Sequence, residues 1–311
     1  MSAQLSVAAR RAGSESHRTR TARRLATGAI ALLLILSLLA AWLLWDNRRL
    51  VITEHRIDVA ALDADPSDEH GLRIAHVSDL HAAEFGTFPQ RLLAAVEGAE
   101  PDLIALTGDM IDVRTRDLGP VLDLAERFSE IAPTYAVLGN HEADSPLREE
   151  FLIGLEQAGV TVLRTEARTV EVDGTALVLA GIDDPRVDRA DGRPVSAPRS
   201  DIALALPPDE AEDGEDAEPP PVVLLAHRPE SFAQYARTPA DVVLSGHAHG
   251  GQVRLPLLGA LYAPHQGVMP PYAEGVHESS GTTMVVSRGL GNSIVGVRVN
   301  NPRELVLVDL V

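Results

Sequence analysis

Five short apolar runs in this sequence each end at a polar residue that is able to bind a metal ion. The residues that follow the runs are Asp79 and His81, Asp109, Asn140, His227, and His247 and His249. A short apolar run that is closed by glycine or by a turn is typical of a buried strand. In an open α/β sheet, ligands bind at the carboxyl ends of the strands. The pattern therefore predicts an α/β protein in which these side chains converge on one site.

The segments around these runs alternate between strand-like and helix-like patterns, which indicates βαβ units. In the first half, strands are expected at 73–78, 103–107 and 135–138, and helices at 88–98, 118–131 and 146–158. After residue 160 the expected elements are strands at 160–163, 168–173, 176–181, 284–287, 294–299 and 304–310, and a helix at 229–237. Residues 51–59 are expected to form an edge strand, and Asp183-Asp184-Pro185 is expected to form a turn.

The seven polar residues at the ends of the runs offer oxygen and imidazole donors and no thiolate. This mixture suits Mn, Fe or Zn better than Mg or Ca, which prefer oxygen ligands. Seven ligands are too many for one tetrahedral site. They suit two divalent ions that lie about 3.5–4 Å apart and share a carboxylate. Two such ions are therefore the expected cofactors.

At this point the sequence resembles the calcineurin-like metallophosphoesterase superfamily, from about residue 72 to the C-terminus. The motif blocks that carry the resemblance are Asp79-Leu80-His81, Gly108-Asp109, Gly139-Asn140-His141-Glu142, His227 and Gly246-His247-Ala248-His249, in the family's order. Residues 245–253 and 287–291 are similar to the membrane-associated bacterial branch. The resemblance implies an α/β fold of two packed mixed β-sheets flanked by helices, an α/β/β/α sandwich.

The resemblance also implies a role for each ligand. One ion would be held by Asp79, His81 and His249. The other would be held by Asn140, His227 and His247, with Asp109 bridging the two. A metal-bridging hydroxide would attack phosphorus in line, because metal coordination lowers the pKa of bound water.

Further residues match the family's pattern around the metal centre. His141 is expected to protonate the leaving oxygen, and Asp112 is expected to orient His141. Val113 stands where phosphoprotein phosphatases carry an arginine, which argues against a phosphoprotein substrate. The candidate substrate contacts are Arg288 and Asn292, in a glycine-rich loop similar to one in the family, and His265, in a Gly/Pro-rich loop that follows the His247 block and could instead be a plain surface loop.

The N-terminal region predicts a membrane anchor. Residues 25–45 are 21 residues without a charge, and about 20 apolar residues span a bilayer as a helix. Six arginines precede this run and two follow it, so the positive-inside rule puts residues 1–24 in the cytoplasm and residues 46–311 outside. Residues 46–71 are then a connector with the edge strand, and 72–311 the metallophosphoesterase domain. A cleaved signal peptide and twin-arginine export remain alternatives.

The charge is unevenly distributed. The chain carries −18 in total, whereas residues 1–50 carry eight arginines and two acids, so the remainder carries −24. A domain this acidic argues against nucleic acid as a partner. The segment 207–221 contains seven acids and five prolines and is expected to be a disordered surface loop.

The expected function is a membrane-anchored, dinuclear-metal-dependent phosphoester hydrolase that acts on an envelope or lipid-linked phosphoester. Within the resembled branch, enzymes that hydrolyse the pyrophosphate of UDP-2,3-diacylglucosamine offer one alternative. A general phosphodiesterase or phosphomonoesterase is another. A non-catalytic metal-binding scaffold is an alternative from a different class, although such a protein should have lost ligands or His141, and all are present.

Overall fold

The computed structural model describes residues 2–60, 62, 71–82, 87–172, 174–193, 195, 219–292 and 296–311, with side chains from residue 23 onward. The chain divides into two compact units, Met1–Asp46 and Asn47–Val311, which are treated separately below. Most of the acidic segment expected at 207–221 lies outside the described residues.

The first unit is a single helix, α1 (Ser2–Asp46). Its segment Arg23–Asp46 has a mean hydropathy of 2.4 over the most apolar window and is long enough to cross a membrane. Apolar side chains are exposed around the whole helix in this segment, a property that membrane spans share with signal sequences. The anchor therefore stays a prediction.

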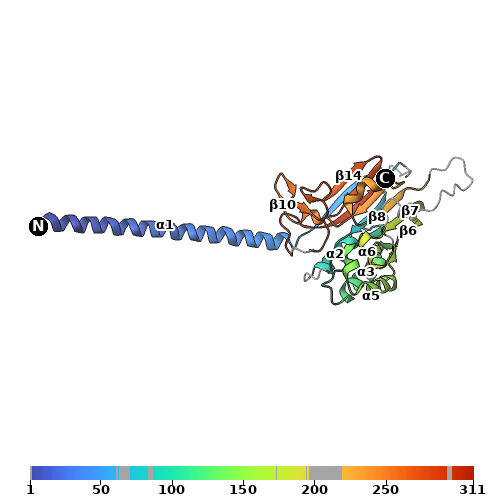
Figure 1. Ribbon diagram of the computed structural model, residues 1–311, viewed down its shortest axis with the longest axis horizontal. Coiled ribbons are helices and arrows are strands. Elements are labelled where there is room, and N and C mark those ends of the chain that lie inside the picture. The colour runs from blue at the N-terminus through green and yellow to red at the C-terminus, as the bar shows by residue number, and fades with distance from the viewer. Residues whose placement is uncertain are drawn as a thin grey trace, which may run out of the picture. The chain divides into compact units, whose positions relative to one another are not determined.

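The second unit is built on two six-stranded sheets (Figure 1). The order in the first sheet is β1 (Leu50–Ile57), β16 (Arg303–Leu310), β2 (Leu72–Val77), β3 (Leu103–Leu106), β4 (Thr134–Ala136) and β5 (Thr161–Val162). The order in the second sheet is β14 (Gly275–Ser279), β15 (Thr282–Val286), β9 (Val242–Ser245), β8 (Val222–Ala226), β7 (Thr175–Ile182) and β6 (Glu166–Val172). Both sheets contain parallel and antiparallel pairs, so the expected pair of mixed sheets is confirmed.

Alternate side chains of the central strands enter two different apolar cores. In β2, Ile74 enters the core between the two sheets, whereas Ala75 and Val77 enter the core beneath the helices. Those helices, which gather on one side of the first sheet in Figure 1, are α2 (Phe88–Glu97), α3 (Gly119–Ile131) and α5 (Arg148–Gln157). Because apolar cores cover both of their faces, β2, β3 and β16 are buried throughout.

Short elements cover the outer face of the second sheet. A third apolar core there joins β7, β8 and β9 to α8 (Phe232–Tyr235). The remaining elements are α4 (Asn140–Asp144), α6 (Pro185–Ala190), η1 (Pro229–Ser231), η2 (His249–Gly251), and two hairpins formed by β10 (Arg254–Leu255) with β11 (Gly259–Ala260) and by β12 (Tyr262–Ala263) with β13 (Gly267–Val268).

The expected strand at 294–299 was wrong in its described part. Residues 293–295 are not described, and Val299 makes only an isolated bridge with Val253.

Two further expectations were corrected. The helix expected at 229–237 is broken into η1 and α8, which end at Tyr235. Asp184 does not form a plain turn, because it caps α6, where its side chain accepts a hydrogen bond from Arg186 N. It also forms an ion pair with Arg228, which lies in the loop after β8.

Candidate metal centre

The seven candidate ligands lie together at the carboxyl ends of β2, β3, β4, β8 and β9, and all seven are buried. The ligand atoms of the first group lie within 4.8 Å of one another and belong to Asp79, His81, Asp109 and His249. A second group within the same limit contains Asp109, His227 and His247. Because Asp109 belongs to both groups, its position fits a carboxylate that bridges two ions.

In the first group, His81 Nε2 lies 3.1 Å from His249 Nε2. His249 Nε2 also lies 3.3 Å from Asp79 Oδ1. The Asp79 carboxylate is oriented by Ser78 Oγ, which donates to Oδ2 at 2.6 Å, and by the backbone N–H of His247 at 3.0 Å. The Asp79 carboxylate therefore connects the loop after β2 with the loop after β9, which carries His247 and His249.

In the second group, His227 Nε2 lies 3.1 Å from Asp109 Oδ2. His227 Nδ1 donates to the backbone carbonyl of Thr107 at 2.7 Å, because a carbonyl can only accept. When the His227 ring is neutral, its one proton is therefore on Nδ1, and Nε2 carries a lone pair that faces Asp109. The second nitrogen of a metal-binding histidine is usually oriented in this way.

Four buried polar atoms of the centre have no hydrogen-bond partner among the described residues. They are His81 Nδ1, Asp109 Oδ2, Asn140 Oδ1 and His227 Nε2. Buried polar atoms without partners are costly and are rare in folded proteins. Divalent ions would supply partners for the oxygen atoms and for His227 Nε2, so the residues present fit the expected cofactors.

Electrostatics support the same interpretation. Burial lowers the pKa of His81 to about 4 and, with neighbouring histidines, holds the pKa values of His247 and His249 well below the ordinary value. These rings are therefore neutral near pH 7, which is the form that metal binding requires. Burial also opposes protonation of His227, but the carboxylates of Asp109 and Asp79 outweigh it and raise its pKa to about 10. The centre thus attracts positive charge.

The backbone of the centre is strained. Five of the seven candidate ligands have a positive φ, which is 52° at Asp79, 50° at His81, 54° at Asp109, 66° at His247 and 50° at His249. Each such residue other than glycine costs on the order of 1–3 kcal/mol, and such residues concentrate at functional sites. The strained residues are thus candidate ligands whose side chains converge.

Two glycines allow the chain to pass close to Asp79. A Cβ on Gly246 would lie 2.3 Å from Asp79 Oδ2, and a Cβ on Gly289 would lie 2.7 Å from Asp79 Cβ. Gly289 also has a φ of +71°, which disfavours any side chain there. Glycine at these two positions therefore makes room for the Asp79 carboxylate.

His141 lies beside the two groups. Its backbone N–H donates to Asp109 Oδ1 at 2.8 Å, and its ring Nε2 lies 4.0 Å from Asp109 Oδ2. The side chain is 21% exposed, whereas that of Asp109 is 1% exposed. The ring therefore reaches from the metal centre toward solvent, where a substrate can meet it.

Asp112 lies close to His141 but is held by other residues. The ligand atoms of His81, Asp112 and His141 lie within 4.8 Å of one another. Asp112 Oδ2 accepts from Arg114 Nη2 at 2.7 Å, and Oδ1 accepts from the N–H groups of Arg114 and Thr115. Burial opposes ionisation of Asp112, but these contacts with Arg114 outweigh it and lower the pKa of the carboxyl. The expected role in orienting His141 stays a prediction.

The three candidate substrate contacts have different surroundings. His265 Nδ1 lies 3.0 Å from His247 Nε2, so this residue contacts a candidate ligand directly. The guanidinium of Arg288 donates to Glu304 at 2.8 Å. Asn292 Nδ2 donates to the carbonyl of Gly296 at 3.0 Å. Of the three side chains, that of His265 is the one in contact with a candidate ligand.

Sequence reasoning gave no role to Glu142. Its buried carboxylate accepts four backbone N–H groups, from Asp109 and Gly139 at 2.9 Å, from Met110 at 2.6 Å and from Ile111 at 3.1 Å. It thereby joins the loops that carry Asp109 and Asn140. A glutamate three residues after the N-cap, here Gly139, is a capping signal, but a five-residue helix is too short to be predicted.

Arg298 was also missed. It is fully buried, donates to Gly291 O at 2.5 Å, and has Nη2 at 3.3 Å from His249 Nδ1. Burial lowers the pKa of its guanidinium to about 10. No pattern in the sequence distinguishes it from an outward-facing strand residue.

Comparisons with known proteins agree with this geometry. A family model described as calcineurin-like phosphoesterase matches residues 72–251, a range that contains all seven candidate ligands. Phosphodiesterase YaeI of Escherichia coli (strain K12) is 31% identical over 245 residues, which are 77% of this chain and 82% of that protein. An uncharacterized metallophosphoesterase of Bacillus subtilis (strain 168), YkuE, is 26% identical over 263 residues, 83% of this chain and 84% of that protein. A transmembrane protein with metallophosphoesterase domain from Danio rerio is 28% identical over 255 residues, 79% of this chain and 54% of that protein.

Proposed function

This chain belongs to the calcineurin-like phosphoesterase family, and we propose that it is a dinuclear-metal-dependent phosphohydrolase held at a membrane by its N-terminal helix. The observation that carries the proposal is the pair of buried ligand groups that share Asp109. Their mixture of carboxylate, amide and imidazole donors favours Mn, Fe or Zn.

Each part of the centre has a chemical task in this proposal. Two bound ions would lower the pKa of a water molecule between them and neutralise charge on the phosphate. Asp109 contributes to both ion sites, and the hydrogen bond to Thr107 keeps His227 Nε2 available. His141, at the open side, donates a proton to the departing oxygen.

A metal analysis tests this centre. The full chain, purified in detergent, stripped with a chelator and reloaded, is expected to bind close to two divalent ions and to hydrolyse phosphoesters only when loaded. His227→Ala is expected to lower the bound metal toward one ion, because it removes a ligand of one group. His277→Ala is the matched control, since that ring contacts the carbonyl of Glu274 away from the centre.

A stoichiometry near one that added Mn does not change would contradict the two-metal proposal. Two bound ions without hydrolysis of any phosphomonoester, phosphodiester or lipid pyrophosphate in a panel would favour the non-catalytic scaffold. The rates of hydrolysis across this panel also show which of the three classes of phosphoester the protein prefers.

The substrate that we favour is an envelope or lipid-linked phosphoester. The Escherichia coli relative is named a phosphodiesterase, which supports phosphodiester chemistry. The predicted anchor would hold the centre close to lipids, and Val113 replaces the phosphate-gripping arginine of phosphoprotein phosphatases. UDP-2,3-diacylglucosamine pyrophosphate hydrolysis is the alternative if the domain lies in the cytoplasm.

The topology has its own test. We expect residues 46–311 to lie outside the cytoplasm and to remain attached to the membrane, because six arginines precede the apolar span and two follow it. Protease added to cells without their wall should digest the domain and leave a short N-terminal fragment. An alkaline phosphatase fused to the C-terminus should be active, since it works only after export.

An inactive fusion and a protected domain would put the domain in the cytoplasm. A released domain that begins after residue 40 would instead indicate a cleaved signal.

A further inference from the structure

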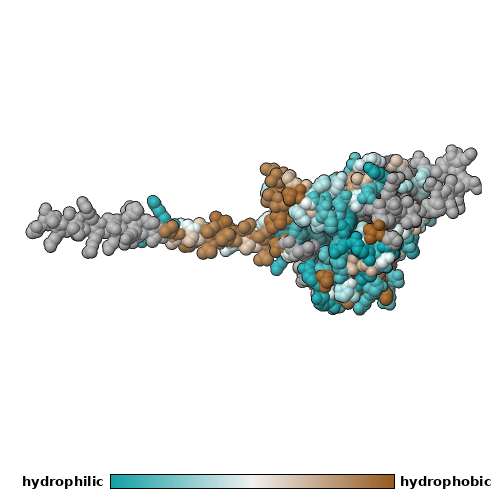
Figure 2. All heavy atoms as spheres, viewed as in Figure 1, coloured by the Kyte–Doolittle hydropathy of each residue, from teal (hydrophilic) through white to brown (hydrophobic). Residues whose placement is uncertain are grey.

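Exposed apolar side chains concentrate on the two small hairpins that follow the last metal-ligand loop. Within 257–269, five large apolar side chains are more than half exposed, namely Leu257, Leu258, Tyr262, Val268 and Met269. In the rest of the described second unit, only Val113 and Ile153 are as exposed. We call residues 255–269 the hairpin surface. Figure 2 shows brown side chains gathered over the part of the domain that Figure 1 labels β10.

The hairpin surface carries no aspartate, glutamate, lysine or arginine. The uncharged stretch extends from Leu255 to Ala273, in a chain of which 23% is charged. The rest of the domain is strongly acidic, with −24 over residues 51–311. Acidic surfaces are repelled by anionic lipid headgroups, so this uncharged stretch can approach a bilayer without that penalty. Large exposed apolar patches mark interaction surfaces.

A short series of hydrogen bonds links the hairpin surface to the residue at which the domain starts. The apolar segment of α1 ends at Asp46 in the sequence, and the second unit begins with Asn47. The Asn47 side chain forms two hydrogen bonds with the backbone of Arg298. Its Nδ2 donates to the carbonyl at 2.7 Å, and its Oδ1 accepts from the N–H at 2.8 Å. The next residue, Val299, accepts from Arg254 N at 3.0 Å, and Arg254 opens β10. Contacts within the domain thus link its starting point to the hairpins.

The same hairpins reach the metal centre. His265 lies in the turn between β12 and β13, and its Nδ1 is 3.0 Å from Nε2 of His247. The exposed residues Tyr262 and Val268 lie opposite each other on the two strands that flank this turn. The rim of the metal centre is therefore continuous with the hairpin surface.

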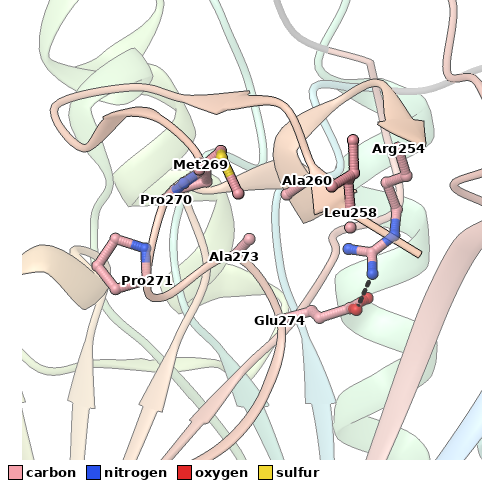
Figure 3. A pocket seen from close by; sticks show the side chains of 9 residues that line it. Arg254, Leu258, Ala260, Met269, Pro270, Pro271, Ala273 and Glu274 are labelled. Atoms are coloured by element: carbon pink, nitrogen blue, oxygen red, sulfur yellow. Dashed lines mark hydrogen bonds and ion pairs between the residues drawn. The ribbon is translucent and has the colours of Figure 1, made fainter. Parts of the chain in front are cut away.

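A pocket of about 300 Å³ opens in the hairpin surface (Figure 3). Leu258, Met269 and Pro271 contribute apolar walls, and Arg254 and Glu274 form an ion pair with each other. Because the two charges neutralise each other, the pocket carries no net charge. The exposed apolar side chains around it, among them Leu258 and Met269, match the interfacial region of a bilayer.

We propose that the hairpin surface docks on the bilayer that α1 enters, so that the rim of the metal centre faces the lipid headgroups. This inference rests on the proposed membrane anchor and deepens the proposed preference for a lipid-linked phosphoester. The partner is the lipid surface. Apolar groups of interfacial elements lie about 5–10 Å into the boundary between headgroups and acyl chains.

Tryptophan fluorescence tests the docking on the full chain in lipid vesicles. The two native tryptophans, Trp42 and Trp45, are replaced by phenylalanine, and Leu257→Trp supplies a single probe. We expect its emission to shift to shorter wavelength and to lose a large share of its intensity when the vesicles contain brominated phosphatidylcholine. Ile153→Trp is the matched control, because Ile153 is an exposed apolar residue on α5, and its emission should not change.

Two further measurements on the same vesicles separate this inference from the proposals it rests on. Flotation reports anchoring, and hydrolysis of a soluble phosphodiester reports catalysis. If the chain floats and hydrolyses but the Leu257→Trp probe is not quenched, docking is overturned while anchoring and catalysis stand. A blue-shifted emission that bromine does not quench would mean that a second copy covers the surface, which also overturns docking. A chain that does not float overturns anchoring and docking together.

Discussion

Replacing His141 with alanine is expected to lower kcat by about 10²–10⁴-fold, the usual loss when a general acid is removed, while the bound metal is unchanged. The metal should remain because the contact that His141 makes with Asp109 runs through its backbone N–H at 2.8 Å, which alanine keeps. The ring is partly exposed and its Nε2 lies 4.0 Å from the Asp109 carboxylate. It is therefore placed to meet a leaving group at the open side of the centre.

The measurement is kcat for a series of aryl phosphodiesters with leaving groups of increasing basicity. Nitrophenolate departs without a proton, so the loss in His141→Ala should be smallest for that substrate and should grow along the series. An equal loss for all leaving groups would contradict the acid role. Loss of metal from the variant would show that His141 is a ligand. His55→Ala, in edge strand β1, should leave both the rate and the metal content unchanged.

The convergence of the candidate ligands was predictable from sequence, because parallel strands bring their carboxyl ends to the same edge of a sheet. The apolar run of β2 indicates where the strand ends, at Val77, and Asp79 follows two residues later. The orientation of the rings was not predictable. The hydrogen bond between His227 and Thr107 joins residues that are 120 positions apart, and no local pattern reports such a contact.

The hairpins escaped prediction because their strands are two residues long. Periodicity needs several residues before it distinguishes a strand from a loop. The sequence Val297-Arg298-Val299 shows the opposite failure, since it alternates like a strand. Its arginine is buried and donates to the carbonyls of Arg288 and Gly291. These contacts with another segment of the chain determine its orientation. Tertiary contacts therefore override local pattern at these places.

Replacing Glu142 with alanine is expected to produce the largest loss of stability among these variants. Its carboxylate accepts four backbone N–H groups inside the protein. A buried donor without an acceptor costs about 1–3 kcal/mol, so four predict a decrease in the free energy of unfolding on the order of 4 kcal/mol or more. Burial and the nearby Asp109 raise the pKa of Glu142 to about 7. Burial of this carboxylate is unfavourable by itself, and the four hydrogen bonds that offset this cost also hold the Asp109 and Asn140 loops together.

Denaturant unfolding of the chelated full chain measures this loss without a contribution from bound metal. Glu149→Ala is the matched control, because that side chain is 77% exposed on α5, and its effect should stay within about 0.5 kcal/mol. Glu142→Gln keeps one carbonyl oxygen, which can accept two of the four N–H groups, so its loss should be intermediate. A loss in Glu142→Ala that matches the control would show that water or a shifted backbone satisfies the four donors. If the loss is large and metal affinity falls with it, Glu142 holds the Asp109 and Asn140 loops in the geometry that binds the ions.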